Sequence, residues 1–327
     1  IASLRERERQ AGRRQDCETL SVGGYPFRIE VLCVGGTFDL KGNPTLQLDL
    51  PSVLAMVQIY APTLLISEFT GPLSISQPGS GAEYVLNWSI GRASVRGLPS
   101  RIERGSLAFE ALSVRDPGTF GPEPVFKAGH FELHGRDASG SRVADPAIET
   151  VLELRGATAE RVHPIAARPT NAEITSMLHG MNDFSPMPWP ERFRAWQARG
   201  GEIEIIKARV EQDAIVAEGA GTLRLTAQGR LDGNLRITVM GLEQVLRMFN
   251  LERFLSEGQV GAALNALDRL LPGLGGIARQ GAAPGLAAAL GQRTELDGKP
   301  ATALPLRFVD GTVFLGPFPV GTVPPAF

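Results

Sequence analysis

The chain has 327 residues and a formal net charge of −2, which argues against a basic nucleic-acid-binding surface. Aromatic residues make up only 6% of the sequence, too few for a surface on which bases stack. Hydrophobic residues make up 43%, so the chain can bury a large core, and its length allows one large β-rich domain or two smaller ones.

The first 16 residues predict a helical lead-in, because the segment from Arg5 to Arg14 is charged and permissive for a helix. The sequence opens on Ile1 instead of a methionine. We therefore expect that a signal peptide or a membrane anchor preceded it, and the sequence does not choose between them. Because no run of 18 apolar residues occurs, we expect no membrane-spanning helix in the chain itself.

Both cysteines, Cys17 and Cys33, flank a turn sequence that starts at Gly23. In a hairpin with a three-residue loop, Gly23 would face Phe27 and the two cysteines would lie directly opposite each other. Opposed strand residues have Cβ atoms about 4.5–5.5 Å apart, close to what a disulfide needs. We predict this disulfide, which indicates an oxidising compartment such as a periplasm, with two buried thiols as the alternative.

From Cys17 to about Gly156, short runs of alternating or apolar residues are separated by turn residues. Residues 45–50, TLQLDL, are one such run, and Gly71-Pro72 is one such turn. Many short strands with regular turn signals are typical of an antiparallel sheet.

After Pro169 the pattern predicts helix. We expect a short helix over 172–180, an extended connector where prolines alternate, and a second helix that starts at Pro190 and ends at Gly200. Trp196 on this second helix is interpreted as a core anchor. A further helical stretch is expected from Leu242 to 271, followed by an Ala/Gly-rich segment that reaches about residue 292.

Strands resume at Glu202, and the last two hairpins differ in their turns. In residues 221–239 the apolar positions are all odd, which predicts a three-residue loop over 232–234. In residues 304–316 the apolar set changes from even to odd, which predicts a two-residue type I′ turn at Asp310-Gly311.

No motif for catalysis, nucleotide binding or a metalloprotease occurs in the sequence. His130 and His134 are the closest histidines, but on a strand they would stand about 13 Å apart, too far to share an ion. We therefore predict a protein that is not an enzyme, with no catalytic residues, no cofactor and no metal site.

Four stretches resemble the bacterial "domain of unknown function 2125" family: SVGGYPFRIEV before Cys33, the W-x-x-x-G-G sequence at Trp196, GRLDGNLRITVMGLEQVL, and the ending LGPFPVGTVPP. The resemblance implies an envelope protein with a periplasmic body and an N-terminal anchor in the inner membrane. It brings no catalytic residues. A looser likeness, to the groove-forming sheets of AsmA-type lipid-handling proteins, is an analogy of architecture only.

The predicted fold is α+β and mainly antiparallel β, with a long curved sheet and helices packed on one side. We expect residues 17–327 to form a single β-rich body with helical insertions at about 172–200 and 242–292. The alternative is two domains, 17–169 and 190–327.

The predicted function is the binding of a lipid or another apolar ligand on the curved sheet. The alternative is a scaffold for an envelope protein partner. A helix near 242–249 could either close the core over the facing strands or leave a slot for acyl chains. The possible ligand face consists of Leu223, Leu225, Leu235, Ile237, Val239, Val245 and Phe249.

Overall fold

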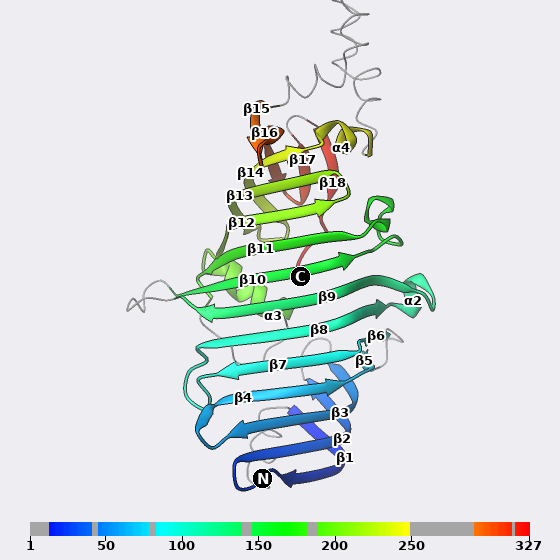
Figure 1. The fold of residues 1–327 in the computed structure, drawn as a ribbon, viewed down its shortest axis with the longest axis vertical. Helices are drawn as coiled ribbons and strands as arrows, with labels where there is room; N and C mark the ends of the chain where they lie inside the picture. Colours follow the sequence, from blue (N-terminus) through cyan, green and yellow to red (C-terminus); the bar gives the residue numbers. More distant parts are fainter. Residues whose placement is uncertain are drawn as a thin grey trace, which may run out of the picture.

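The computed structural model describes residues 13–40, 45–78, 83–138, 146–181, 189–248, 291–315 and 318–327. Within these residues, 18 strands join one antiparallel sheet that runs the length of the molecule (Figure 1). The sheet therefore continues through the segment around 169–190, because β10, β11 and β12 pair in sequence order.

The strands of the first half are β1 (Arg13–Gly23), β2 (Arg28–Leu40), β3 (Leu46–Gln58), β4 (Ala61–Thr70), β5 (Leu73–Ser76), β6 (Glu83–Asn87), β7 (Ile90–Arg96), β8 (Arg104–Arg115) and β9 (Pro124–Asp137). Those of the second half are β10 (Ala147–Ala157), β11 (Thr170–His179), β12 (Glu202–Gln212), β13 (Ile215–Leu225), β14 (Leu231–Met240), β15 (Gln292–Leu296), β16 (Lys299–Val309), β17 (Thr312–Leu315) and β18 (Phe318–Thr322).

Most strands pair with their neighbours in sequence, and two places depart from this order. Two pairs of strands lie between β3 and β8. One pair is β4 with β7, and the other is the short β5 with β6. Near the C-terminal end, β16 pairs with β14, β15 and β17. The helices α2 (Pro117–Phe120), α3 (Trp189–Ala198) and α4 (Leu242–Met248), with the 3₁₀ turn η1 (Pro164–Ala167), interrupt this series.

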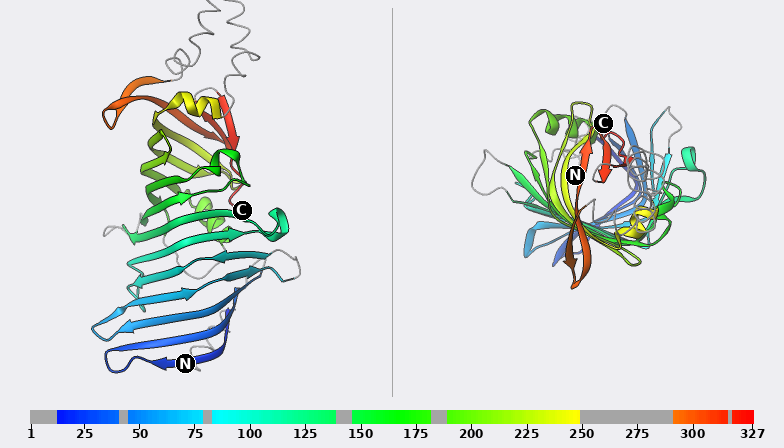
Figure 2. Two further views of the ribbon diagram at one scale, coloured as in Figure 1. Left: turned by 45° about the vertical axis from the view of Figure 1, so that its right-hand side comes forward. Right: turned by 90° about the horizontal axis from the view of Figure 1, so that it is seen from above.

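The sheet is curved across its width. Viewed from above, the strands follow an arc that is open on one side (Figure 2). In Figure 1, α3 lies behind the strands, on the side toward which the sheet curves. We call the face that α3 contacts the inner face and the opposite face the outer face.

One row of directly paired residues crosses the inner face from end to end, and none of its members is charged. This inner row consists of Val22, Val31, Ala55, Ser67, Ala93, Leu107, Leu133, Leu152, Ile174, Ala208, Gly219, Ile237 and Leu304. Because side chains alternate between faces along a strand, the adjacent row lies on the outer face. That outer row contains Glu68, Arg92, Glu132, Glu153, Glu173, Arg209 and Glu218.

Two clusters of buried side chains form where helices meet the inner face. Leu242 and Leu246 of α4 pack with Val239, Leu304 and Leu315. Trp196 of α3, which is 1% exposed, packs with Ile148 and Met181 and donates a hydrogen bond from Nε1 to the carbonyl oxygen of His179, at 2.7 Å. The prediction of Trp196 as a core anchor is confirmed.

Several local predictions can be compared directly with the structure. The helix from Pro190 and the two-residue turn at Asp310-Gly311 are confirmed: α3 ends at Ala198, Val309 pairs with Thr312, and both turn residues have positive φ. The predicted helix over 172–180 is wrong, because Ala172, Ile174, Ser176 and Leu178 alternate within strand β11. The predicted loop over 232–234 is also wrong, because Gly233 pairs with Leu223 and the turn lies at 226–230.

Three further predictions lie partly outside the described residues: the helical lead-in, the 242–292 insertion, and the extended connector, of which residues 182–188 are not described. Of the helical lead-in, residues 13–16 belong to strand β1, and residues 1–12 lie outside the described part. Of the predicted 242–292 insertion, the structure describes α4 as a helix of seven residues and the strand start at Gln292. Residues 249–290 lie outside the described ranges.

Candidate apolar binding face

The disulfide between Cys17 and Cys33 is present, with Cα atoms 5.5 Å apart. The predicted register around it is wrong, because Leu20 pairs with Cys33 and Cys17 pairs with Gly36. A longer hairpin turn, with Gly23 opposite Glu30, produces this shift of three residues. The strand is irregular next to the disulfide, since Gly35 has a φ of +59°.

A cavity of about 500 Å³ opens on the inner face between β7 and α3. Its apolar lining residues come from the five neighbouring strands β7 to β11, the turn at Ile102, the residue Met181 just after β11, and helix α3: Val95, Ile102, Leu107, Leu133, Ile148, Leu178, Met181 and Phe193. The volume lies within the roughly 300–1,000 Å³ that is usual for small-molecule sites. The inner row passes through this cavity at Leu107 and Leu133.

The hollow forms because two glycines face each other across the sheet. Gly105 of β8 pairs directly with Gly135 of β9, and both line the cavity. A Cβ atom placed on either glycine would meet its nearest neighbours at 3.7 and 3.8 Å, which are ordinary contact distances. A Cβ atom would therefore fit at either position, so the two glycines are not required there to avoid a clash, and they leave space in the lining of the cavity.

The five strand residues predicted as part of a ligand face lie on the inner face, but at its covered end. Leu223 is 8% exposed and Val239 is 4% exposed. Ile237 and Val245 pack against the cluster under α4, and Leu225 packs against the cluster under α3. Leu235 is half-buried, and Phe249 lies outside the described residues. The cavity is formed instead by residues that the sequence analysis did not single out.

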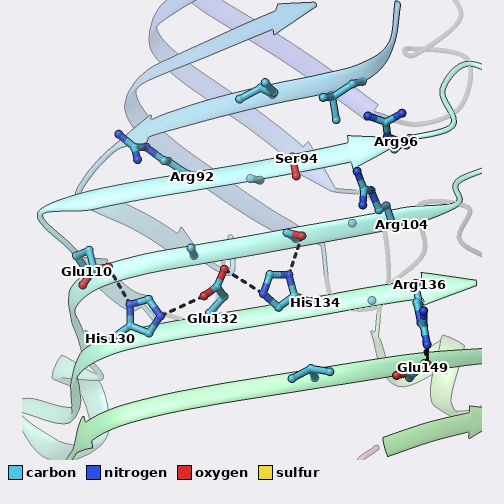
Figure 3. Close-up of a pocket in the computed structure, with 18 residues that line it drawn as sticks. Arg92, Ser94, Arg96, Arg104, Glu110, His130, Glu132, His134, Arg136 and Glu149 are labelled. Atoms are coloured by element: carbon cyan, nitrogen blue, oxygen red, sulfur yellow. Dashed lines mark hydrogen bonds and ion pairs between the residues drawn. The ribbon is translucent and has the colours of Figure 1, made fainter. Parts of the chain in front are cut away.

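The outer face above this cavity is polar. There a second hollow of about 790 Å³ is lined by charged residues of β7 to β10 and by apolar side chains that include Leu64, Ile66 and Val151 (Figure 3). Arg96, Arg104 and Arg136 stand directly opposite one another on β7, β8 and β9. Arg136 forms an ion pair with Glu149 through its Nε, at 2.8 Å. At this place the sheet therefore has an apolar hollow on its inner face and, on its outer face, a hollow that carries charged side chains.

A chain of polar contacts runs along the outer face of β9. His130 Nδ1 lies 2.8 Å from Glu110 Oε1, and His134 Nε2 lies 3.0 Å from Glu132 Oε1. The hydrogen bond to Glu110 raises the pKa of His130, while burial opposes that effect. The predicted strand placement of the two histidines is confirmed, and Glu132 lies between them and contacts both.

Arg209 of β12 forms hydrogen bonds with three carboxylates on the outer face. Its nitrogens lie 2.7 Å from carboxylate oxygens of Glu211, Glu218 and Asp297. The hydrogen bonds from Arg209 lower the pKa of Asp297 and raise that of Arg209 itself. This contact ties the turn after β15 to strands β12 and β13.

No described helix is long and apolar enough to cross a membrane. Searches of curated proteins and of solved structures found no match. A family model with the description "Uncharacterized protein conserved in bacteria (DUF2125)" matches residues 1–324. Because this match covers nearly the whole chain, the chain belongs to that family, as its sequence motifs suggested.

Proposed function

We propose that this protein binds an apolar ligand, such as the acyl chain of a lipid, in the inner-face cavity between β7 and α3. The observation that carries the proposal is the glycine pair Gly105–Gly135, which leaves about 500 Å³ of apolar space on a face without charged residues in its inner row. Leu133 at the cavity is 38% exposed, so apolar surface remains open to a ligand. The role is binding, and no reaction is assigned.

Filling the cavity tests this proposal. Gly135→Leu would place a side chain in the hollow, where even a Cβ makes ordinary contacts. We expect the fluorescence of cis-parinaric acid, a fatty-acid probe, to rise on binding to the parent chain and to remain low with Gly135→Leu. Ala220→Leu is the control, because Ala220 is exposed on strand β13 away from the cavity.

A variant that folds like the parent yet binds the probe equally well would contradict the cavity as the site. Gly105→Leu fills the same hollow from the neighbouring strand and gives an independent measurement if Gly135→Leu does not fold. Thermal melting of all three variants separates lost binding from lost structure.

A second candidate function, a scaffold for a protein partner, is supported by the N-terminal end of the sheet. Tyr25, Phe27, Ile59 and Tyr60 are 91%, 76%, 56% and 78% exposed, and the Ile59 amide donates a hydrogen bond to the Phe27 carbonyl oxygen, so the two turns adjoin. Exposed aromatic side chains of this kind are enriched in protein interfaces. A photo-crosslinking residue at Tyr60 should capture one partner in cell envelopes, and the same residue at Tyr84 should not.

We further propose a periplasmic location with an anchor in the inner membrane. The Cys17–Cys33 disulfide supports an oxidising compartment, where such bonds form and persist. The intact mass of the alkylated native protein, measured with and without reductant, tests the location. Two freely alkylated cysteines in protein taken from the periplasm would contradict it.

A further inference from the structure

The outer face of β9 and β10 brings together three side chains that are suited to bind a metal ion. The ligand atoms of His130, Glu132 and Glu153 all lie within 4.8 Å of one another. His130 and Glu132 stand two residues apart on β9, and Glu153 is paired directly with Glu132 on β10. Figure 3 shows His130 and Glu132 pointing toward each other from the same face of the strand.

We propose that His130, Glu132 and Glu153 form a binding site for a divalent transition metal, with zinc as the best-fitting ion. One imidazole nitrogen and two carboxylate oxygens are ordinary zinc ligands. Three protein ligands leave a fourth position for water, as in sites that keep an open coordination position. A neutral histidine and two carboxylates also balance the charge of a divalent ion.

Each of the three side chains is already oriented by a partner on its far side. Glu110 holds His130 through Nδ1 at 2.8 Å, which leaves Nε2 toward the glutamates. His134 contacts Oε1 of Glu132 at 3.0 Å, which leaves Oε2, the atom 3.3 Å from His130 Nε2. A carboxylate that accepts a hydrogen bond from the second ring nitrogen is the usual support for a metal-binding histidine.

The third ligand is supported in the same way. Arg155 donates from its Nε to Oε1 of Glu153 at 2.6 Å, which orients this carboxylate on β10. The partners Glu110, His134 and Arg155 come from β8, β9 and β10, which places the whole arrangement on paired strands of one sheet. Ligands on such strands are positioned more rigidly than ligands on loops.

The register of the outer row gives a separate reason to expect a cation. Glu132, Glu153 and Glu173 stand directly opposite one another on β9, β10 and β11. Like charges in directly opposed positions destabilise a sheet. A bound divalent ion between the first two of these residues would remove that repulsion.

The test uses the full-length chain without an affinity tag, stripped of metal. We expect isothermal titration with zinc chloride to show one ion bound per chain, with that binding lost in His130→Ala and in Glu153→Gln. Glu110→Gln, which removes the support and not the ligand, should weaken binding by about 10- to 100-fold. Cobalt(II) provides a second readout, because its visible absorption reports the coordination geometry.

His179→Ala is the matched control. His179 Nε2 lies 3.0 Å from Glu204 on the same outer face, but within the described residues no third ligand joins that pair. Zinc affinity and the cobalt spectrum should therefore match those of the parent.

The proposal would be overturned by no saturable binding to the parent, by equal binding in folded His130→Ala or Glu153→Gln, or by an equal loss of binding in His179→Ala. Circular dichroism of the metal-free variants establishes that each one folds. The outcome does not depend on whether the inner cavity binds a lipid.

Discussion

The two ends of the inner face carry the same kind of side chain but differ in what covers them. Near β14 to β17, the inner-face residues Val239, Leu304 and Leu315 are 4%, 1% and 4% exposed beneath α4. Near β1 and β2, Val22 and Ile29 are each 57% exposed. The same alternation of side chains therefore makes a closed core at one end and an open apolar surface at the other. The difference is that helix α4 covers the first end.

The most severe test of this comparison introduces a charge at each end of the inner row. Leu304→Asp buries an unpaired carboxylate at a position that is 1% exposed, and we expect a loss of roughly several kcal/mol that abolishes folding. Val22→Asp makes the same change at the other end of the row, at a position that is 57% exposed, so the protein should stay folded. Circular dichroism and thermal melting measure both; equal unfolding would show that the open end is also core.

Removing the anchor of α3 should have the next largest effect. Trp196→Ala leaves a large void beside Ile148 and Met181 and should cost roughly 3–5 kcal/mol in the free energy of unfolding. Trp196→Phe keeps one aromatic ring but loses the five-membered ring and the hydrogen bond to the His179 carbonyl; the cost should be smaller than for alanine and above the about 1 kcal/mol of the hydrogen bond alone. Urea denaturation separates the two, and similar costs would mean that the ring does not anchor the helix.

Removing the disulfide should have a smaller and more local effect. Replacing both cysteines with serine removes a cross-link across 16 positions, and about 3 kcal/mol is expected in the chain-entropy model. Because the bond joins β1 to β2, hydrogen exchange should accelerate there first, while β14 and β16 keep their protection. Faster exchange along the whole sheet would show that the N-terminal end supports the rest.

The smallest expected effect is a response to acid at the Arg209 contact. Arg209 lowers the pKa of Asp297 below its ordinary value of 3.8, so the contact adds stability above that ordinary value and loses it as pH falls through the lowered pKa. Asp297→Asn should lower the melting temperature slightly at neutral pH, where the contact is present, and leave it unchanged below the lowered pKa, so this part of the acid melting curve becomes flatter. An unaltered acid profile in the variant would mean that the contact does not contribute.

Turn and cap residues and the alternation of apolar residues predicted several elements correctly. Pro190 and Gly200 bracket α3, and the Asp310-Gly311 turn follows from the change in the parity of the apolar residues. Alternation also placed His130 and His134 on one face of a strand. These features depend on residues close together in sequence, which is why one sequence is sufficient to find them.

Features that depend on pairing between strands were not predictable in the same way. Alternation shows which face a side chain occupies but not which residue lies opposite, so the three-residue shift at Cys17 was missed. The pairing of Gly105 with Gly135, and of Glu132 with Glu153, escaped for the same reason. The alternation in residues 105–109 and 131–135 indicates which side chains share one face, but only the register between β8 and β9 shows which of them lie opposite each other at the cavity. Residues 172–178 were misread because Ala and Ser positions carry little apolar contrast.

Pairing between sequence neighbours has a consequence for how such a molecule could change in size. Each hairpin contributes two strands, and neighbouring strands lie about 4.8 Å apart, so one more hairpin would lengthen the sheet by about 10 Å. The new strands would extend the inner row and the outer row together, provided that their residues keep the alternation. Insertion or loss of hairpins is therefore a simple evolutionary route to longer or shorter apolar faces, and within the described residues β10 to β13, which pair strictly in order, are the natural place for it.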